Sequence, residues 1–373
     1  MLIGVPRELK DHEYRVAITP AGVHELTAKG HRVLVEHDAG AGSALSDAGF
    51  TAAGAAIAQT ADEVWAAADL VLKVKEPVPA EYHRLRAEQV LFTYLHLAAS
   101  RETASALLAA GTTAIAYETV RDKDQSLPLL APMSEVAGRL APQAGAAHLL
   151  AAAGGRGVLM GGVPGVAPAD VVVIGAGVAG SNAVAVAVGL GASVAVLDLD
   201  LVKLRRLEDR YAGRVRTLYA STLETERAVT GADLVIGAVL VPGARAPRVV
   251  SHETVTQMRP GSVLVDIAID QGGCFEDSRP TTHTEPTYRV ADSLFYCVTN
   301  MPAAVPHTST YALTNATLPY VLALAEHGWR AALAHDEGLA AALSTHQGTL
   351  VNQSLADDLN LPHCGPRAVA AAA

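Results

Sequence analysis

The sequence predicts an α/β protein built from two doubly wound parallel-sheet domains. Two stretches of the chain alternate short apolar runs of β type with segments of helical pattern, which is typical of parallel sheets covered by helices on both faces. The length of 373 residues suits two domains of roughly 100–200 residues each. Half of the residues are hydrophobic but only 4% are aromatic, so we expect cores built from aliphatic side chains.

The first stretch begins at the N-terminus, and helical patterns such as "PAGVHELTAKG" lie between its apolar runs. Its strands are expected at residues 1–6, 31–37, 69–77, 89–97 and 112–120.

The second stretch contains six predicted strands, and a doubly wound sheet of this kind is complete at six. They are expected at residues 170–177, 193–200, 215–221, 233–240, 262–270 and 294–302. The helical segment that starts at about residue 306 is therefore expected to return to the first domain.

The join between the domains is expected near residues 126–150, where Pro128 and Pro132 mark a linker. Ser134 is a suitable N-cap for the long helix that follows. Pro142 lies inside that helical pattern and should bend the helix, or end it at the preceding residue, because proline removes one hydrogen bond and clashes with the preceding turn.

A glycine-rich motif follows the first strand of the second stretch. "GAGVAG" places Gly175, Gly177 and Gly180 between an apolar strand and a helical segment, and the next strand ends at Asp198. This whole context matches the Rossmann dinucleotide-binding fingerprint, although the glycine spacing alone is a weak signal and a structural turn is the alternative. The pyrophosphate would rest on the helix N-terminus, while Asp198 would bind the ribose hydroxyls and repel a 2′-phosphate. The motif predicts NAD in preference to NADP.

The predicted division is a discontinuous substrate domain, residues 1–128 and 307–373, and an NAD-binding Rossmann-like domain, residues 129–306. The active site is expected in the cleft between these two domains.

Polar side chains occur where strands are expected to end, which is the edge at which open α/β sheets bind ligands. Lys75 and His96 end two predicted strands of the first stretch, and Arg15 lies between its first strand and the following helix. Asp270 ends the fifth predicted strand of the second stretch. Two cations, an imidazole and a carboxylate beside a nicotinamide are suited to hydride transfer.

Each of these residues also has a structural alternative. Lys75 could be a strand-end lysine with a buried stem, His96 a satisfied core histidine, and Asp270 the N-cap of a turn. Asp266, inside the same predicted strand, is interpreted as a structural carboxylate bonded to backbone. Lys73 is also interpreted as structural.

Composition and charge exclude several classes of partner. The net charge of −10 and the lack of a Lys/Arg run argue against nucleic acid and anionic membrane. No stretch is apolar and long enough to span a bilayer, and the N-terminus lacks the features of a secretion signal. The three cysteines have neither metal-ligand nor CxxC spacing, and the adjacent Glu326 and His327 would diverge on a helix. We therefore expect a cytoplasmic, reduced protein without a metal.

Long blocks of the sequence carry a resemblance to a known family. They include "GVPRELKDHEYRVAITPAGV" at residues 4–23 and "DIAIDQGGCFEDSRPTTHTEPTY" at residues 266–288; further blocks are 71–82, 91–100, 131–150, 161–180 and 300–320. On these blocks the sequence resembles the alanine dehydrogenase family, over nearly all of residues 1–350. That family is similar over the same blocks to the NAD-binding subunit of proton-translocating transhydrogenase.

The resemblance implies a reaction, an assembly and residue roles. The reaction is the reversible NAD-dependent oxidative deamination of L-alanine with water to pyruvate and ammonium, and the assembly is a homohexamer. Arg15 and Lys75 would hold the substrate, with His96 and Asp270 as the acid/base pair. The positions that would contact NAD are Ser134, Gly175, Gly177, Val178, Ala179, Gly180, Asp198, Lys203, Ala220, Val239, Leu240, Ile267, Ala268, Ile269, Asp270, Arg279, Val298, Thr299, Asn300 and Met301.

Two alternatives to an alanine dehydrogenase stay open. A transhydrogenase subunit would need a membrane partner, and a non-catalytic NAD-binding module would have lost the chemistry of the strand-exit residues. One position departs from the family pattern: relatives often carry a serine on the adenosine side, whereas this chain has Ala220 followed by Ser221. A side-chain hydrogen bond at that point is left open.

Overall fold

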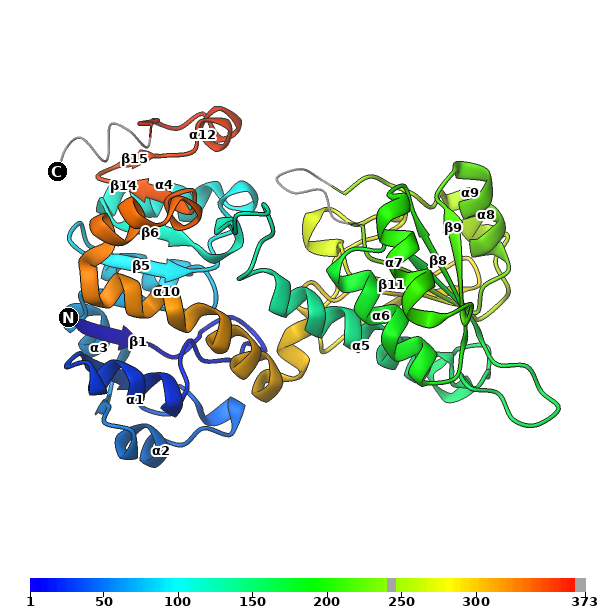
Figure 1. The fold of residues 1–373 in the computed structure, drawn as a ribbon, viewed down its shortest axis with the longest axis horizontal. Coiled ribbons are helices and arrows are strands. Elements are labelled where there is room, and N and C mark those ends of the chain that lie inside the picture. Colours follow the sequence, from blue (N-terminus) through cyan, green and yellow to red (C-terminus); the bar gives the residue numbers. More distant parts are fainter. Residues whose placement is uncertain (240–245, 366–373) are drawn as a thin grey trace. The chain divides into compact units, whose positions relative to one another are not determined.

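The computed structural model describes residues 1–239 and 246–365. The chain forms two compact units: unit one comprises Met1–Met133 and Val305–Ala373, and unit two comprises Ser134–Ala304. In each unit helices pack on a mostly parallel sheet (Figure 1), so the predicted α/β class is confirmed. No helix in the described part of the chain is long and apolar enough to cross a membrane.

Unit one has an eight-stranded sheet in the order β15-β14-β6-β5-β4-β1-β2-β3. The strands are β1 (Leu2–Val5), β2 (Arg32–Glu36), β3 (Ala56–Ala58), β4 (Leu70–Leu72), β5 (Val90–Thr93), β6 (Thr113–Ala116), β14 (Leu343–His346) and β15 (Thr349–Leu350). The helices are α1 (Pro20–Ala28), α2 (Asp47–Ala52), α3 (Ala61–Ala67), α4 (Arg101–Ala110), α10 (Pro306–His335), α11 (Glu337–Ala340) and α12 (Gln353–Leu359). The short 3-10 helices are η1 (Ala41–Ser43), η2 (Pro79–Arg84), η3 (Leu97–Ala99) and η4 (Tyr117–Thr119).

The C-terminal segment belongs to the sheet of unit one. After α10, which packs against α1, strand β14 pairs antiparallel with β6. The apolar patterns did not predict β14, because three of its four residues are polar. Hydrogen bonds accommodate Thr345 and His346 in the interior. Thr345 Oγ1 donates to the Thr112 carbonyl at 2.8 Å, and His346 Nδ1 lies 2.9 Å from Thr113 Oγ1.

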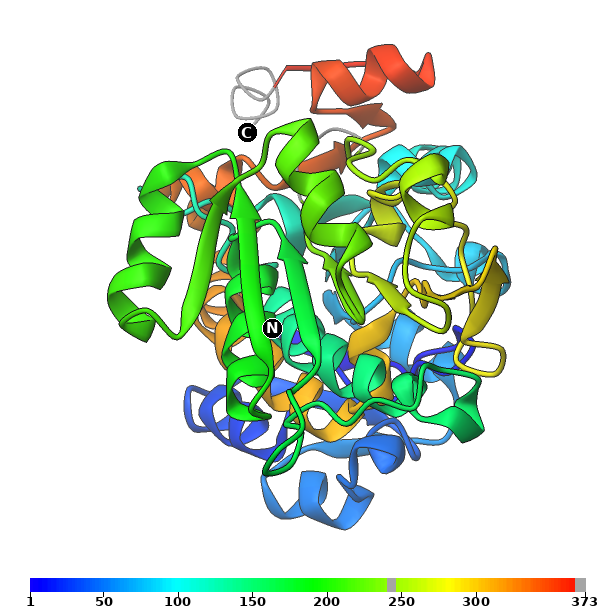
Figure 2. The same ribbon diagram turned by 90° about the vertical axis from the view of Figure 1, so that its right-hand side faces the viewer.

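Unit two has a seven-stranded sheet in the order β12-β13-β11-β10-β7-β8-β9. Some of its strands, drawn in green, face the viewer in Figure 2. Its strands are β7 (Asp170–Ile174), β8 (Ser193–Asp198), β9 (Val215–Tyr219), β10 (Leu234–Gly237), β11 (Val263–Asp266), β12 (Thr287–Val290) and β13 (Ser293–Tyr296). Its helices are α5 (Ala131–Leu149), which begins in unit one, α6 (Val178–Gly189), α7 (Leu201–Tyr211), α8 (Thr222–Thr230) and α9 (His252–Thr256), with 3-10 helices η5 (Ala151–Ala153), η6 (Ile269–Gln271) and η7 (Met301–Ala304). The six predicted strands form the parallel part, and the unpredicted β12 pairs antiparallel at the edge.

Both faces of this sheet are buried, which explains its nearly continuous apolar strands. Along β7, Val171 and Val173 point into one core cluster, whereas Val172 and Ile174 point into the other.

The long helix α5 corrects the expected N-cap and excludes one of the two outcomes expected at Pro142, the break; the bend stays a prediction. The helix begins at Ala131, so Ser134 lies inside the helix and is not its N-cap, and Pro132 occupies the first turn, where proline is tolerated. The predicted break before Pro142 does not occur, because the helix continues to Leu149. Proline inside a helix costs about 3 kcal/mol. Buried side chains on both sides of it, Ala141 and Leu149, offset that cost.

Candidate active site

The glycine-rich turn between β7 and α6 needs glycine for steric reasons. Gly175 has φ +102°, and a Cβ there would lie 2.5 Å from the Ala238 carbonyl oxygen. At Gly180 a Cβ would lie 1.7 Å from the Gly175 carbonyl oxygen. A Cβ at Gly177, by contrast, would meet no atom within 4 Å, so this glycine leaves open space above the turn.

The N-terminus of α6 is open to an anion. Its N-cap, Gly177, provides no side-chain cap, whereas α7, α8 and α9 are capped by Asp200, Ser221 and Ser251. The first N–H groups of a helix need acceptors and carry the positive end of the helix dipole. This end can therefore accept a phosphate group.

Asp198 ends β8 beside this turn. Its Oδ2 accepts the Ala176 N–H at 2.6 Å, and its Oδ1 accepts the Asp200 N–H at 2.8 Å. The carboxylate is thus fixed by the backbone of the glycine-rich turn and by the start of α7.

Most of the predicted nucleotide-contacting positions follow the carboxyl ends of the parallel strands of unit two. Those that the structure describes there are Gly175 to Gly180 after β7, Asp198 in β8, Ala220 after β9, Val239 after β10, Ile267 to Asp270 after β11, and Val298 to Met301 after β13. Leu240 lies outside the described residues. Three positions lie elsewhere: Ser134 in α5, Lys203 in α7, and Arg279, whose guanidinium stacks 4.2 Å above the Tyr288 ring. Ser221, next to Ala220, caps α8 by accepting the Glu224 N–H at 3.3 Å.

In unit one, Arg15 lies between β1 and α1 and is only 2% exposed. Its Nε donates to Glu13 Oε1 at 2.6 Å, and its Nη2 donates to Oε2 of the same carboxylate. Burial disfavours the charge, but Glu13 more than compensates and raises the pKa of Arg15. Its Nη1 donates to Met133 Sδ at 3.0 Å; a thioether is a weak acceptor, which a substrate carboxylate could replace.

Lys75 lies three residues beyond β4, which ends at Leu72, so it follows the strand and does not end it. No described residue accepts a hydrogen bond from its Nζ. Burial and then the nearby positive charges of Arg15 and Lys10 lower its pKa. An ammonium whose proton is easily lost suits a group that polarises a substrate carbonyl or imine.

Lys73, two residues before Lys75, is completely buried. Its burial and its ion pairs confirm that it has a structural role. Its Nζ lies 3.1 Å from Glu8 Oε2 and 3.0 Å from Glu81 Oε1. Burial alone would lower its pKa, but the two carboxylates raise it, so Lys73 stays charged. Glu8 Oε1 also accepts the Val74 N–H at 2.6 Å and thereby fixes the segment that leads to Lys75.

His96 lies three residues beyond β5 and is half-buried. Its backbone is left-handed, with φ +46° and ψ +38°, and its ring stacks on Tyr94 with centroids 5.7 Å apart. Non-glycine residues held at positive φ are uncommon and cluster at functional sites.

In unit two, β11 ends at Asp266, so Asp270 does not end a strand but lies in η6. The fully buried Asp266 accepts the N–H groups of Ala268 at 3.0 Å and Cys274 at 2.9 Å, and the Ser278 hydroxyl at 2.5 Å. Burial outweighs these donors and raises the pKa of Asp266. The structural interpretation of Asp266 is confirmed: it closes the loop that carries Asp270.

Comparison with known proteins identifies the family. The family model "Alanine dehydrogenase/PNT, N-terminal domain" matches residues 4–137, and "Alanine dehydrogenase/PNT, C-terminal domain" matches residues 141–353. The chain belongs to the alanine dehydrogenase/PNT family.

Relatives within this family are similar over the whole chain. The alanine dehydrogenase of Mycolicibacterium smegmatis is 65% identical over 97% of this chain and 98% of its own length. That of Mycobacterium tuberculosis H37Rv is 64% identical over 100% of both chains. A solved L-alanine dehydrogenase has a TM-score of 0.93 at 50% identity, covering 96% of this chain and 99% of its own. A transhydrogenase from Sinorhizobium meliloti has a TM-score of 0.79 at 27% identity, covering 95% of this chain and 100% of its own.

In this member of the alanine dehydrogenase/PNT family, the sequence analysis missed the carboxylates that fix the proposed site residues. Glu13 accepts a hydrogen bond from the Arg15 side chain. Glu8 fixes the segment before Lys75, and Glu118 accepts the His96 N–H at 2.6 Å. Glu118 lies near the end of the strand predicted at residues 112–120, and the structure places it in η4, just beyond β6. A search for polar residues at the ends of predicted strands, which found His96, could therefore have found Glu118 too.

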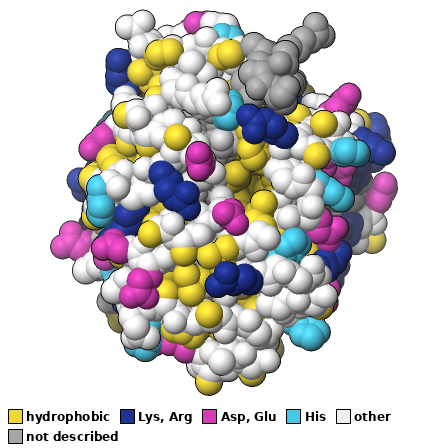
Figure 3. Space-filling model, turned by 90° about the vertical axis from the view of Figure 1, so that its left-hand side faces the viewer, with side chains coloured by type: hydrophobic (Ala, Val, Ile, Leu, Met, Phe, Trp, Pro, Cys, Tyr) yellow, Lys and Arg dark blue, Asp and Glu magenta, His cyan; other side chains and the backbone are white. Residues whose placement is uncertain are grey.

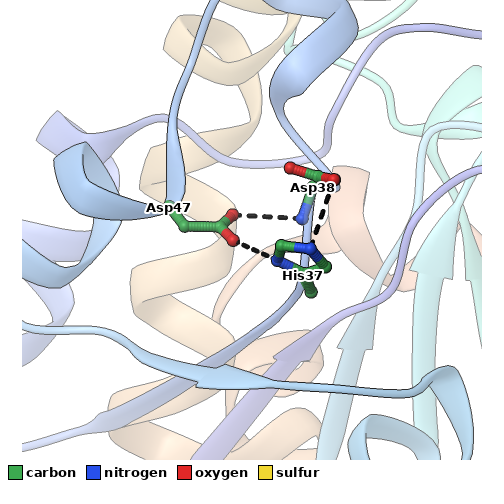
Figure 4. A group of neighbouring side chains, drawn as sticks. All are labelled: His37, Asp38 and Asp47. Atoms are coloured by element: carbon green, nitrogen blue, oxygen red, sulfur yellow. Dashed lines mark hydrogen bonds and ion pairs between the residues drawn. The ribbon is translucent and has the colours of Figure 1, made fainter.

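A group of potential metal ligands, His37, Asp38 and Asp47, was also not predicted (Figure 4). His37 Nδ1 lies 2.6 Å from Asp47 Oδ2, and its Nε2 lies 3.3 Å from Asp38 Oδ2. The hydrogen bond that His37 donates to Asp47 and the charge of Asp38 raise the pKa of His37. Because both ring nitrogens already face carboxylates, we interpret the group as an exposed ion-pair cluster at the start of α2.

On the molecular face drawn in Figure 3, side chains of both charges are interspersed with hydrophobic ones.

Proposed function

We propose that this chain is an NAD-dependent L-alanine dehydrogenase, which converts L-alanine, NAD and water reversibly into pyruvate, ammonium and NADH. The observation that carries the proposal is the identity of 64–65% to curated alanine dehydrogenases over nearly the whole of both chains. The transhydrogenase match covers 95% of this chain and 100% of its own, but its identity is only 27%. We also propose a homohexamer, on the family resemblance.

We further propose that unit two is the NAD-binding domain, as predicted for residues 129–306, and that unit one is the substrate domain, as predicted for residues 1–128 and 307–373. The residues of unit two fit the cofactor: α6 has an uncapped N-terminus, Gly177 leaves space above it, and Asp198 presents a fixed carboxylate. When bound, NAD supplies the hydride acceptor. The chain supplies the groups that bind the substrate and move protons.

Each proposed residue has a task that suits its chemistry. Arg15 binds the substrate carboxylate, and Lys75 polarises the nitrogen or oxygen on C2. Addition of water to the imine and collapse of the carbinolamine both need a proton carrier, and the imidazole of His96 takes that role. Asp270 orients the water and balances positive charge.

The direct test is NADH oxidation with pyruvate, measured with and without ammonium. An alanine dehydrogenase oxidises NADH rapidly only when both pyruvate and ammonium are present. If the purified chain binds NADH but shows no ammonium-dependent oxidation, a transhydrogenase subunit or a non-catalytic module becomes the better assignment.

Replacement of Asp198 tests cofactor choice. We expect the unmodified protein to prefer NADH strongly over NADPH, and Asp198→Asn to narrow that preference, because the carboxylate repels a 2′-phosphate. Asparagine retains an oxygen that can accept the Ala176 N–H, so loss of the charge is separated from loss of the turn geometry. The measurement is kcat/KM with each cofactor; equal efficiencies in the unmodified protein would contradict the proposal.

Lys75→Met should make the protein more stable and abolish its activity. The pKa of Lys75 is lower in the folded state than in the unfolded state. At every pH below that lowered pKa, the buried ammonium therefore reduces the free energy of unfolding by its full amount. Methionine keeps the apolar stem, and Tm at neutral pH should rise by a few degrees while pyruvate turnover is lost. The difference should shrink as pH rises from the lowered pKa towards the unfolded value of about 10.4. A stability gap that stays constant up to pH 11 would show that the ammonium is not its cause.

A further inference from the structure

We propose that Glu118 is the positioning residue of His96. By accepting main-chain N–H groups, its carboxylate holds His96 in the left-handed backbone conformation from which the imidazole acts. This inference rests on the proposed role of His96 as proton carrier.

The hydrogen bonds that carry the proposal lie beyond the paired ends of two neighbouring strands. Strands β5 and β6 pair in parallel up to Thr93 and Ala116. Glu118 follows β6 in η4, and there its Oε1 accepts the His96 N–H at 2.6 Å. Both of its oxygens also lie within hydrogen-bonding distance of the Leu95 N–H, at 3.2 and 3.1 Å. The carboxylate thus provides acceptors for two consecutive N–H groups where the ladder of the sheet stops.

His96 needs such support because its conformation is unfavourable. At φ +46° the Cβ of an L-residue crowds the following carbonyl, and the conformation persists only where the surroundings impose it. Hydrogen bonds from main-chain N–H groups to an ionised carboxylate are among the stronger ones. If φ of His96 returned to negative values, its Cα–Cβ bond would point elsewhere, and the ring would leave its stacked place on Tyr94.

Two effects of Glu118 on His96 can be distinguished: positioning of its main chain, and stabilisation of a protonated ring by the negative charge. A nearby carboxylate could also act by stabilising an imidazolium, and both effects disappear in Glu118→Ala. Glu118→Gln removes the charge but keeps an amide oxygen that can replace Oε1, the atom that accepts from both Leu95 and His96. Rescue by glutamine therefore indicates positioning.

The experiment uses the full chain with four replacements: Glu118→Ala, Glu118→Gln, His96→Ala and the double variant Glu118→Ala with His96→Ala. Glu63→Ala serves as the control, because Glu63 also accepts a main-chain N–H, that of Gln59 at 3.0 Å, but at the start of α3. We expect Glu118→Ala to lower kcat of pyruvate amination about 100-fold with little change in NADH affinity, since a displacement of about 1 Å can cost that much. Glu118→Gln should stay within about tenfold of the unmodified protein, and Glu63→Ala should keep full kcat.

Two further readouts exclude a general loss of structure. In the double variant, loss of Glu118 should cost no further activity once His96 is gone, because the two residues act as a unit. The ring signals of His96 in 15N-histidine NMR, assigned by their absence in His96→Ala, should shift in Glu118→Ala and stay near their original positions in Glu118→Gln.

The outcomes separate this inference from the proposed function. If the unmodified chain lacks ammonium-dependent activity, or His96→Ala keeps it, the proposed function or the role of His96 fails. If His96→Ala is inactive but Glu118→Ala keeps near-normal kcat, or Glu118→Gln is as impaired as Glu118→Ala, positioning by Glu118 is overturned while the enzyme assignment stands.

Discussion

Replacing His96 with alanine should lower kcat for pyruvate amination by about 10²–10⁴-fold, the usual contribution of general acid–base catalysis. The alanine variant cannot carry the protons that water addition and carbinolamine collapse require. NADH affinity should change little, because the glycine-rich turn and Asp198 belong to unit two whereas His96 belongs to unit one. The measurements are kcat, the Kd of NADH and Tm on one preparation.

His346→Ala is a matched control for this variant, because His346 is a buried histidine with structural contacts. It is 6% exposed, its Nδ1 lies 2.9 Å from Thr113 Oγ1, and its ring lies 4.9 Å from that of Trp329. Its removal should lower Tm and leave the activity per folded molecule largely unchanged. A His96→Ala protein with the same pattern, less stable but nearly fully active, would make His96 a core histidine and remove it from the mechanism.

Alanine at Gly180 should destabilise unit two by about 3 kcal/mol or more, because overpacking against atoms that cannot move is costly. The new Cβ would lie 1.7 Å from the Gly175 carbonyl oxygen, which belongs to the same tight turn. NADH binding should be lost along with the turn. Thermal unfolding and NADH titration measure the two effects.

Two other glycines of the same region separate stability from binding. Gly177 has φ −73° and ψ −162°, which alanine adopts readily, so Gly177→Ala should fold normally. It should nevertheless weaken NADH binding by tenfold or more, because its Cβ would occupy the space proposed for the pyrophosphate. Gly189, the last residue of α6, also has open space, and Gly189→Ala should keep NADH affinity and gain up to about 1 kcal/mol. Unchanged NADH affinity in Gly177→Ala would place the cofactor elsewhere.

The core strands of both units were predictable, because strands buried on both faces leave continuous apolar runs that glycines and polar residues interrupt. The strands at and near the edges of the sheet of unit one could not be predicted. The three-residue β3 is too short to show a pattern, and β14 contains polar residues whose partners lie more than 200 positions away in the sequence. Strand ends were placed too late at Lys75, His96 and Asp270, because the apolar pattern continues into loops that are also buried.

The chemical groups of the candidate site were visible in the sequence, whereas their supporting contacts were not. A glycine motif predicts the turn that it forms, because the residues of the turn are close together in the sequence. The contact between Glu13 and Arg15 is equally local, but nothing in the spacing indicates that the two side chains pair. The bonds from Glu8 to Val74 and from Glu118 to His96 join positions 66 and 22 residues apart. Only the parallel arrangement of the strands brings these positions together.

The buried cluster of Lys73, Glu8 and Glu81 restricts how this chain can change during evolution. Loss of Lys73 leaves two carboxylates in the interior without a cation, which costs about 3–5 kcal/mol, a large part of the stability of an ordinary domain. Exchange of all three residues for well-packed apolar side chains would avoid that cost, but Lys73 cannot be lost before the two glutamates. We therefore expect homologous sequences that keep both glutamates to keep Lys73 as well, so that the segment after β4 is inherited together with the segment after β1 and helix η2.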